Sequence, residues 1–317
     1  MQIDGICVKD IDGFETFAKI KPLTKGLSGR KKFKIETLDG QHMILHISEA
    51  DEYERMKAEY EMAEHAAVLD IQMSRPVCFG KCNNGKHTYR LLTWVEGTDA
   101  EALLPTLAQA DQYKLGVKSG ELLRKIHSTP APSSTRDWDV YHTQKLQKWL
   151  DVYSANTVIH CAKGELIIQY LKQNSGILDG REQTFIHGDF NTENIIAMPN
   201  GEVGAIDFNS YNTAYGDPWF DLCTAAWMPA MFPPFYTGQL AGYFCGAPSA
   251  SFWNVYTYYL AYDALAALAD SDGTFGIDDS KYVTDNILAW TDGFKRPVPV
   301  WFRATPKNRV SSVFGDL

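Results

Sequence analysis

Apolar and polar residues alternate along the first 47 residues with the two-residue period of β-strands. This alternation predicts strands over 17–20, 32–36 and 42–47, and the run Leu38-Asp39-Gly40 predicts a hairpin turn between the last two. A further hairpin is expected over 77–95, around an Asn-Asn-Gly turn. The start of the chain is therefore expected to form a small antiparallel sheet.

The apolar period lengthens to that of a helix between the third strand and this second hairpin. Ser48 and Asp51 predict a capping box where the helix begins. Glu59 borders the apolar stripe, one turn from apolar residues on either side, so we expect its side chain to lean inward. The stripe consists of Tyr53, Met56, Tyr60, Ala63 and Ala67.

Helical periods dominate from about residue 110 onward. They predict helices over about 110–127, 146–153, 166–171 and 252–269. In the first of them two glycines, Gly116 and Gly120, lie four residues apart, which would let another helix approach closely. Aromatic residues are dense after residue 221 and are expected to belong mainly to the core.

One segment, 185–207, interrupts the helices with a strand, a polar loop and a second hairpin. A sharp corner at His187-Gly188-Asp189 is followed by Asn194, an apolar strand, a Pro-Asn-Gly turn and a returning strand that ends at Asp207. Because the turn folds the second strand back beside the first, Asp189, Asn194 and Asp207 should meet at one end.

Three such oxygen-bearing side chains suit phosphoryl transfer from a magnesium-bound nucleotide. One carboxylate must orient and deprotonate an incoming hydroxyl, and a carboxylate with an amide can hold Mg²⁺, which prefers oxygen ligands. We assign the first role to Asp189 and the metal to Asn194 and Asp207. An isolated pattern of this kind can also be an ordinary solvated loop.

Composition permits an enzyme of this kind. The chain has 317 residues, 45% of them hydrophobic, which is enough for two lobes and a substantial core. Its formal charge of −9 argues against nucleic acid as a partner. We expect no signal peptide, no membrane span and reduced cysteines, and hence a cytoplasmic protein.

Four motifs in order resemble those of the aminoglycoside phosphotransferase and choline kinase superfamily. They are His187-Gly188-Asp189 with Asn194, Ile206-Asp207-Phe208, Gly216-Asp217-Pro218, and Asp221-Leu222. The resemblance implies an α+β, two-lobe, protein-kinase-like fold. A nucleotide-binding lobe would span 1–95, with a small antiparallel sheet, and a mainly helical catalytic and substrate-binding lobe would span 96–317. It also implies ATP or GTP as co-substrate.

The resemblance further implies nucleotide contacts in the first lobe. Ser28 and Gly29 would lie in a loop over the phosphates, Glu59 would be the helix glutamate, and the Thr93 carbonyl and Val95 amide would read the base. Such folds place a lysine on the third strand to hold the phosphates. Here His46 stands at that position, and its charge would depend on pH near neutrality.

Three functions remain open from the sequence. The first is an antibiotic phosphotransferase of the aminoglycoside type, which would confer resistance, and the second is a metabolic kinase acting on choline, a sugar or an amino-alcohol. Asp263, a carboxylate on an apolar helix face, needs a partner; it is the candidate acceptor contact in either, and a helix N-terminus is the structural alternative. The third is a non-catalytic nucleotide-binding module, suggested by His46 but opposed by the intact Asp189, Asn194 and Asp207.

Overall fold

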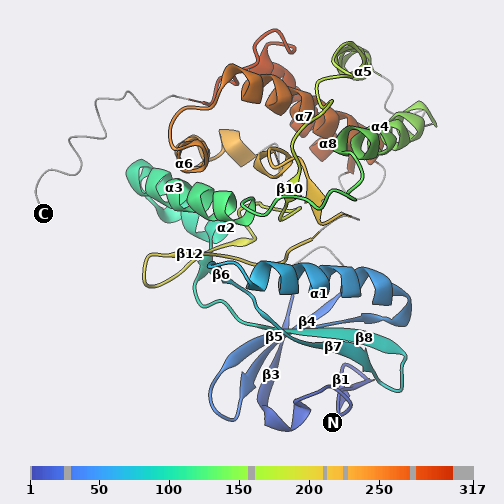
Figure 1. The fold of residues 1–317 in the computed structure, drawn as a ribbon, viewed down its shortest axis with the longest axis vertical. Coiled ribbons are helices and arrows are strands. Elements are labelled where there is room, and N and C mark those ends of the chain that lie inside the picture. Colours follow the sequence, from blue (N-terminus) through green and yellow to red (C-terminus); the bar gives the residue numbers. More distant parts are fainter. Residues whose placement is uncertain are drawn as a thin grey trace, which may run out of the picture. The chain divides into compact units, whose positions relative to one another are not determined.

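The strands predicted at the start of the chain form a five-stranded antiparallel sheet in the order β3-β4-β5-β8-β7 (Figure 1). The computed structural model describes residues 2–24, 30–155, 161–209, 213–223, 228–271 and 276–302. The five strands are β3 (Phe17–Leu23), β4 (Lys31–Thr37), β5 (His42–Glu49), β7 (Pro76–Cys82) and β8 (His87–Thr93). A short hairpin of β1 (Gln2–Ile3) and β2 (Ile6–Cys7) precedes them.

The chain divides into two units. Unit 1 contains residues 1–103 and 187–214, and unit 2 contains 104–186 and 215–317. The sheet and the segment with Asp189, Asn194 and Asp207 thus fall in the same unit. The lobe boundary near residue 96 stays a prediction.

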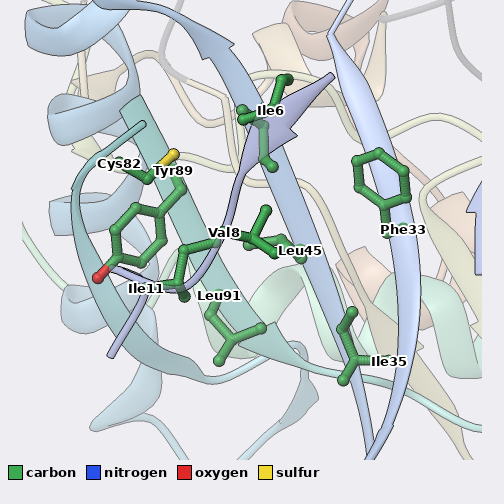
Figure 2. Packing of buried hydrophobic residues seen from close by; sticks show 10 residues of the cluster. Ile6, Val8, Ile11, Phe33, Ile35, Leu45, Cys82, Tyr89 and Leu91 are labelled. Carbon is green, nitrogen blue, oxygen red and sulfur yellow. The ribbon is translucent and has the colours of Figure 1, made fainter. Parts of the chain in front are cut away.

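One face of the five-stranded sheet builds the core of unit 1. Inward-facing residues of β4, β5 and β8 pack with Ile6, Val8 and Ile11 from the N-terminal segment (Figure 2). The strand residues are Phe33, Ile35, Leu45, Ile47, Tyr89 and Leu91. Because side chains alternate along a strand, the residues between them project from the opposite face.

A helix, α1 (Tyr53–Ala67), packs against β7 and β8 (Figure 1). The predicted capping box is wrong, because Ser48 continues strand β5 and a 3₁₀ turn, Ala50–Glu52, leads into the helix. The β5–β8 ladder extends to the pair Glu49↔His87. The strand thus continues through Ser48 to Glu49, and α1 begins only at Tyr53, too far along the chain for Ser48 to cap it.

The predicted hairpin after the polar loop is confirmed. Strand β11 (Ile195–Ala197) pairs antiparallel with β12 (Val203–Ala205), in the register Ile195↔Ala205. Two short strands of unit 1 complete a second sheet in the order β6-β12-β11-β9. They are β6 (Gln72–Met73) and β9 (Thr98–Asp99), the latter followed by α2 (Ala100–Leu103).

Unit 2 is mainly helical, as expected. Its helices are α3 (Gln109–Ile126), α4 (Trp138–Ala155), α5 (Ala162–Gln173), α6 (Pro233–Phe244), α7 (Ala250–Ala269) and α8 (Gly276–Thr291), with a small pair of strands, β10 (Thr184–Phe185) and β13 (Tyr215–Gly216). Helix α7 is buried along most of its length and contacts α4, α5 and α8. In the described part of the chain, no helix has the length and apolarity needed to cross a membrane.

The expectation that Gly116 and Gly120 admit a close neighbour is confirmed. Helix α6 lies against them: a Cβ on Gly116 would stand 1.9 Å from the carbonyl oxygen of Phe235, and one on Gly120 would stand 1.9 Å from that of Gln239. On α6, Gly238 and Gly242 face backbone atoms of α3 in the same way. The two backbones thus pack without intervening side chains.

Candidate active site

The loop between β10 and β11 is held in place by His187. Its side chain is fully buried. Nε2 lies 3.0 Å from the carbonyl oxygen of Ile206, and Nδ1 lies 3.3 Å from the amide nitrogen of Asp189. A carbonyl can only accept and an amide N–H can only donate, so this pattern fits the neutral tautomer with the proton on Nε2. His187 therefore ties the loop to the residue directly before Asp207.

The carboxylate of Asp189 is oriented by two amide side chains. Asn191 Nδ2 donates to Oδ1 at 2.8 Å, and Asn194 Nδ2 donates to Oδ2 at 3.0 Å. Asn194 Nδ2 also donates to the backbone oxygen of Asp189 at 2.9 Å. These bonds fix the orientation of the carboxylate through both of its oxygens. The Oδ1 atom of Asn194 takes no part in them.

The hairpin brings Asp207 to the same end of β11 and β12. The amide of Ile206 donates to the carbonyl oxygen of Asn194 at 3.0 Å. Asp207, the next residue along the chain, therefore lies close to Asn194. Asp207 has a backbone φ of 59°, a left-handed conformation uncommon outside glycine. Such conformations are costly and cluster at functional sites, which here fits the predicted metal ligand.

Positive charges surround the carboxylate of Asp207. Arg90 Nη2 donates to Oδ1 at 2.7 Å, and Lys32 Nζ lies 3.9 Å from Oδ2. Burial alone would raise the pKa of Asp207, but the charge of Arg90, with a smaller contribution from Lys32, outweighs it and holds the pKa well below its usual range. Asp207 is therefore ionised throughout the physiological range.

The donor set fits a divalent cation shared with phosphate groups. A carboxylate at Asp207 and an amide oxygen at Asn194 are hard oxygen ligands of the kind that Mg²⁺ prefers. Among the described residues, no group of three or more His, Cys, Asp or Glu side chains gathers in a metal-binding arrangement. A metal at this position would thus depend on ligand oxygens to complete its coordination.

Glu59 leans inward from α1 as expected and is only 3% exposed. Arg90 Nη1 lies 3.0 Å from its Oε2, and Arg30 Nη2 lies 3.0 Å from its Oε1. His46 is also buried, on β5. Burial, followed by the nearby charge of Arg90, lowers the pKa of His46 well below its ordinary value, so its imidazole is neutral at pH 7.

Arg30, Lys32 and Arg90 were not predicted as site residues from the sequence. The signal available for Arg90 was a charged residue within the apolar run Tyr89 to Leu92. Of the other predicted nucleotide contacts, Thr93 ends β8 and Val95 follows it, with the Thr93 amide donating to the Arg75 carbonyl oxygen at 2.8 Å. Those at Ser28 and Gly29 lie outside the described residues.

The aspartates of the last motifs organise unit 2. Asp217 is fully buried and receives hydrogen bonds from Arg181 and from the Tyr259 hydroxyl. Asp221 Oδ2 lies 3.0 Å from His127 Nε2, while His127 Nδ1 lies 2.9 Å from the Tyr243 hydroxyl. Both aspartates thus have hydrogen-bond partners within unit 2.

Asp263 lies half-buried on α7 in unit 2. Loss of hydration raises the pKa of its carboxyl to about 8. Burial and, in turn, the negative charge of Asp263 raise the pKa values of Cys223, Tyr256 and Tyr262. Burial therefore favours the neutral, protonated form of Asp263 in the folded protein.

Comparison with known proteins identifies the family. The sequence profile of the phosphotransferase enzyme family (APH) matches residues 19–253. No curated protein sequence matches the chain.

Three solved structures illustrate the shared fold. The amicoumacin kinase hAmiN, in complex with AMP-PNP, Ca²⁺ and Ami, is 14% identical, with a TM-score of 0.60 over 89% of this chain and 90% of that one. The aminoglycoside phosphotransferase APH(3'')-Id of Streptomyces rimosus is 21% identical, with a TM-score of 0.54 over 78% and 92%. A Haemophilus somnus protein described as a fructosamine-3-kinase is 15% identical, with a TM-score of 0.59 over 86% and 92%.

These likenesses bear out the kinase-like α+β fold expected from the motifs. The family profile covers both the N-terminal sheet and the loop that carries Asp189. The chain belongs to the phosphotransferase enzyme family and is a small-molecule kinase.

Proposed function

We propose that this protein transfers the γ-phosphoryl group of ATP or GTP to a hydroxyl group of a small molecule in the cytoplasm. The observation that carries the proposal is the convergence of Asp189, Asn194 and Asp207 at one end of the β11–β12 hairpin, tied together by the hydrogen bonds of His187 and Asn194. A phosphotransferase needs these three functions, a base and two metal ligands, within a single nucleotide's reach.

Asp189 is the proposed catalytic residue. Its carboxylate accepts the proton of the acceptor hydroxyl as that oxygen attacks the γ-phosphorus. A new oxygen–phosphorus bond forms, the bond from the γ-phosphorus to the β,γ-bridging oxygen breaks, and the nucleoside diphosphate leaves. The amides of Asn191 and Asn194 hold the carboxylate, so orientation, the main protein contribution in such reactions, is set before the acceptor arrives.

Asn194 and Asp207 are the proposed ligands of Mg²⁺. The ion would neutralise charge on the phosphates as the transferred group moves. The other proposed nucleotide contacts are Ser28, Gly29 and His46 near the phosphates, Glu59 as the helix partner of the phosphate-binding cation, and Thr93 and Val95 at the base.

The proposed acceptor is an aminoglycoside-type antibiotic, so that the protein would confer resistance. Support comes from the aminoglycoside phosphotransferase of Streptomyces rimosus among the similar structures. The acidic character of the chain and the half-buried carboxyl of Asp263 also suit an acceptor that carries amino groups. We propose Asp263 as a contact to that acceptor.

The second candidate is a metabolic kinase acting on choline, a sugar or an amino-alcohol. The protein described as a fructosamine-3-kinase, which has a similar fold, favours it. The same site would perform the same chemistry, and only the acceptor would differ. A non-catalytic nucleotide-binding module is the weaker alternative, because such a protein has no use for the oriented carboxylate of Asp189.

Transfer of labelled γ-phosphate tests these possibilities. MgATP and MgGTP are offered with aminoglycosides, macrolides, choline, amino-alcohols and sugars, and Asp189→Ala is the control. Transfer to one compound class that vanishes in Asp189→Ala supports the proposal and names the acceptor class. If wild type binds nucleotide yet Asp189→Ala transfers at the wild-type rate, the role of Asp189 is excluded.

A further inference from the structure

Three polar residues form a cross-strand row on the sheet face opposite the core of unit 1. The register of the β4–β5 ladder pairs Lys32 with His46, and that of the β5–β8 ladder pairs His46 with Arg90. Their neighbours along the strands, Phe33, Leu45 and Leu91, belong to the core on the other face. The row therefore places one cation, Lys32 or Arg90, on each side of the strand position where kinase-like folds carry their lysine.

The middle member of this row does not carry charge. His46 is 3% exposed, and its Nδ1 lies 3.2 Å from Arg90 Nη2. Because a guanidinium can only donate, Nδ1 is the acceptor and is unprotonated. The positive charge missing from the position of His46 is thus found on its neighbour, one strand away.

Arg90 makes the contact to the helix glutamate that is expected of the absent lysine, and a second contact to the proposed metal ligand. In kinase-like enzymes the strand lysine pairs with the glutamate of the following helix, beside the metal-binding aspartate. Here Arg90 Nη1 lies 3.0 Å from Glu59 Oε2, and Nη2 lies 2.7 Å from Asp207 Oδ1. Arg90 thus bridges the helix and the proposed metal ligand from a different strand.

The ion pairs near Glu59 and Asp207 contain more cations than carboxylates, so their net charge favours an anionic ligand. Around Glu59 and Asp207 the ion pairs of the described residues join four cations, Arg30, Lys32, Arg55 and Arg90, to three carboxylates, Glu52, Glu59 and Asp207. In addition, Nε of Arg90 is buried and has no hydrogen-bond partner among the residues that the structure describes. A buried donor without a partner costs free energy, and an acceptor oxygen from a ligand would remove that cost.

We propose that Arg90 takes the place of the missing strand lysine and, with Lys32 beside it, binds the phosphates of the nucleotide. The inference rests on the proposed function, since it presumes a phosphate-bearing nucleotide at Asp207. His46 then acts as a neutral hydrogen-bond acceptor that positions the guanidinium. The charge required by the fold is retained, but it reaches the site from β8 instead of β5.

Equilibrium binding of MgATP, MgGTP and AMP to the full-length chain tests this assignment. Arg90→Met removes the charge at similar side-chain length and should weaken binding of the triphosphate about 10- to 100-fold, the range expected for a lost charge-assisted contact. Binding of AMP should change much less. Lys31→Met, which removes a charge from the exposed, opposite side of β4, is the matched control and should bind like wild type.

The decisive variant returns the charge to the usual strand. His46→Lys combined with Arg90→Met should recover most of the triphosphate affinity lost in Arg90→Met alone. Urea unfolding shows whether Arg90→Met folds. If it does not, His46→Lys combined with Arg90→Met is compared with His46→Met combined with Arg90→Met. The latter has neither charge and should bind the triphosphate at least 10-fold more weakly.

The outcomes separate this inference from the proposed function. If wild type binds MgATP or MgGTP and Arg90→Met binds equally well, Arg90 is not the phosphate ligand, although the proposed function stands. If the charge-returning variant folds but binds no better than its uncharged counterpart, the relocation is likewise excluded. If wild type binds neither nucleotide, the proposed function fails, and the assignment of Arg90 fails with it.

Discussion

Arg181 and Asp217 form a bidentate ion pair inside unit 2. Nε of Arg181 lies 2.7 Å from Oδ2 of Asp217, and Nη2 lies 2.7 Å from Oδ1. The amide of Trp219 and the hydroxyl of Tyr259 also donate to this carboxylate, and the guanidinium lies 3.7 Å from the centre of the Trp219 ring. The conspicuous Gly-Asp-Pro motif therefore serves the packing of unit 2.

Removing one partner of this pair should destabilise the protein strongly. Asp217→Ala leaves a largely buried guanidinium without its anion, which typically costs about 3–5 kcal/mol of unfolding free energy. Urea unfolding followed by circular dichroism measures the loss. The control is Lys163→Ala, whose pair with Asp285 is exposed and should contribute less than about 1 kcal/mol. Equal losses in the two variants would contradict a structural role for Asp217.

Replacing Asn194 should change the metal requirement. Asn194→Ala removes a proposed Mg²⁺ ligand and one of the hydrogen bonds to Asp189, so we expect the Mg²⁺ concentration for half-maximal transfer to rise at least about 10-fold, with a lower maximal rate. Activity titrated against Mg²⁺ after treatment with a chelator measures both. Asn200→Ala, in the turn of the same hairpin, is the control, because its side chain bonds only locally to the Glu202 amide. An unchanged titration for Asn194→Ala would remove Asn194 from the metal site.

Adding a methyl group at Gly120 should disrupt the contact between α3 and α6. The new Cβ would stand 1.9 Å from the Gln239 carbonyl oxygen, and backbone cannot yield as a flexible side chain can. We expect Gly120→Ala to lose at least about 1–3 kcal/mol of unfolding free energy despite its better helix propensity. Glu121→Ala, exposed on the same helix, should stay near wild type. A stabilised Gly120→Ala would show that the two helices can separate without cost.

The elements were largely predictable because their signals are local. Alternation gave the strands of the first sheet, and the helical period gave α3 and α7, since each depends on residues only a few positions apart. The start of α1 was not predictable in this way. Ser48 carries a capping signal, but it pairs with Thr88 of β8, 40 residues away, and a 3₁₀ turn separates it from the helix.

The residues of the candidate site show the same difference between local and long-range signals. Asp189, Asn194 and Asp207 lie on one hairpin, so their convergence followed from a single short turn. The link between His46 and Arg90 depends on the register of β5 against β8, 44 residues apart in the chain. No local pattern carries that register, so the pairing of Arg90 with Glu59 could not be predicted from the sequence.

The raised pKa of Asp263 predicts how stability depends on pH. In the unfolded chain this carboxyl titrates near 4, whereas in the folded protein burial raises its pKa to about 8. Between these values the folded state holds the extra proton, so the contribution of Asp263 to the unfolding free energy falls as pH rises from about 4 to 8 and is constant above. Asp263→Asn keeps the shape without ionising and should gain stability relative to wild type across this window.

Urea unfolding of both proteins at several pH values between 5 and 8 measures this difference. Cys223, Tyr256 and Tyr262, whose pKa values Asp263 influences, are uncharged throughout that range because burial raises their pKa values as well. They therefore do not obscure the trend. Asp151→Asn, exposed on α4, is the control and should differ from wild type by a constant amount. A constant difference for Asp263→Asn as well would mean that Asp263 is already ionised at pH 5, and a protonated carboxyl could then play no part in recognising an amino-bearing acceptor.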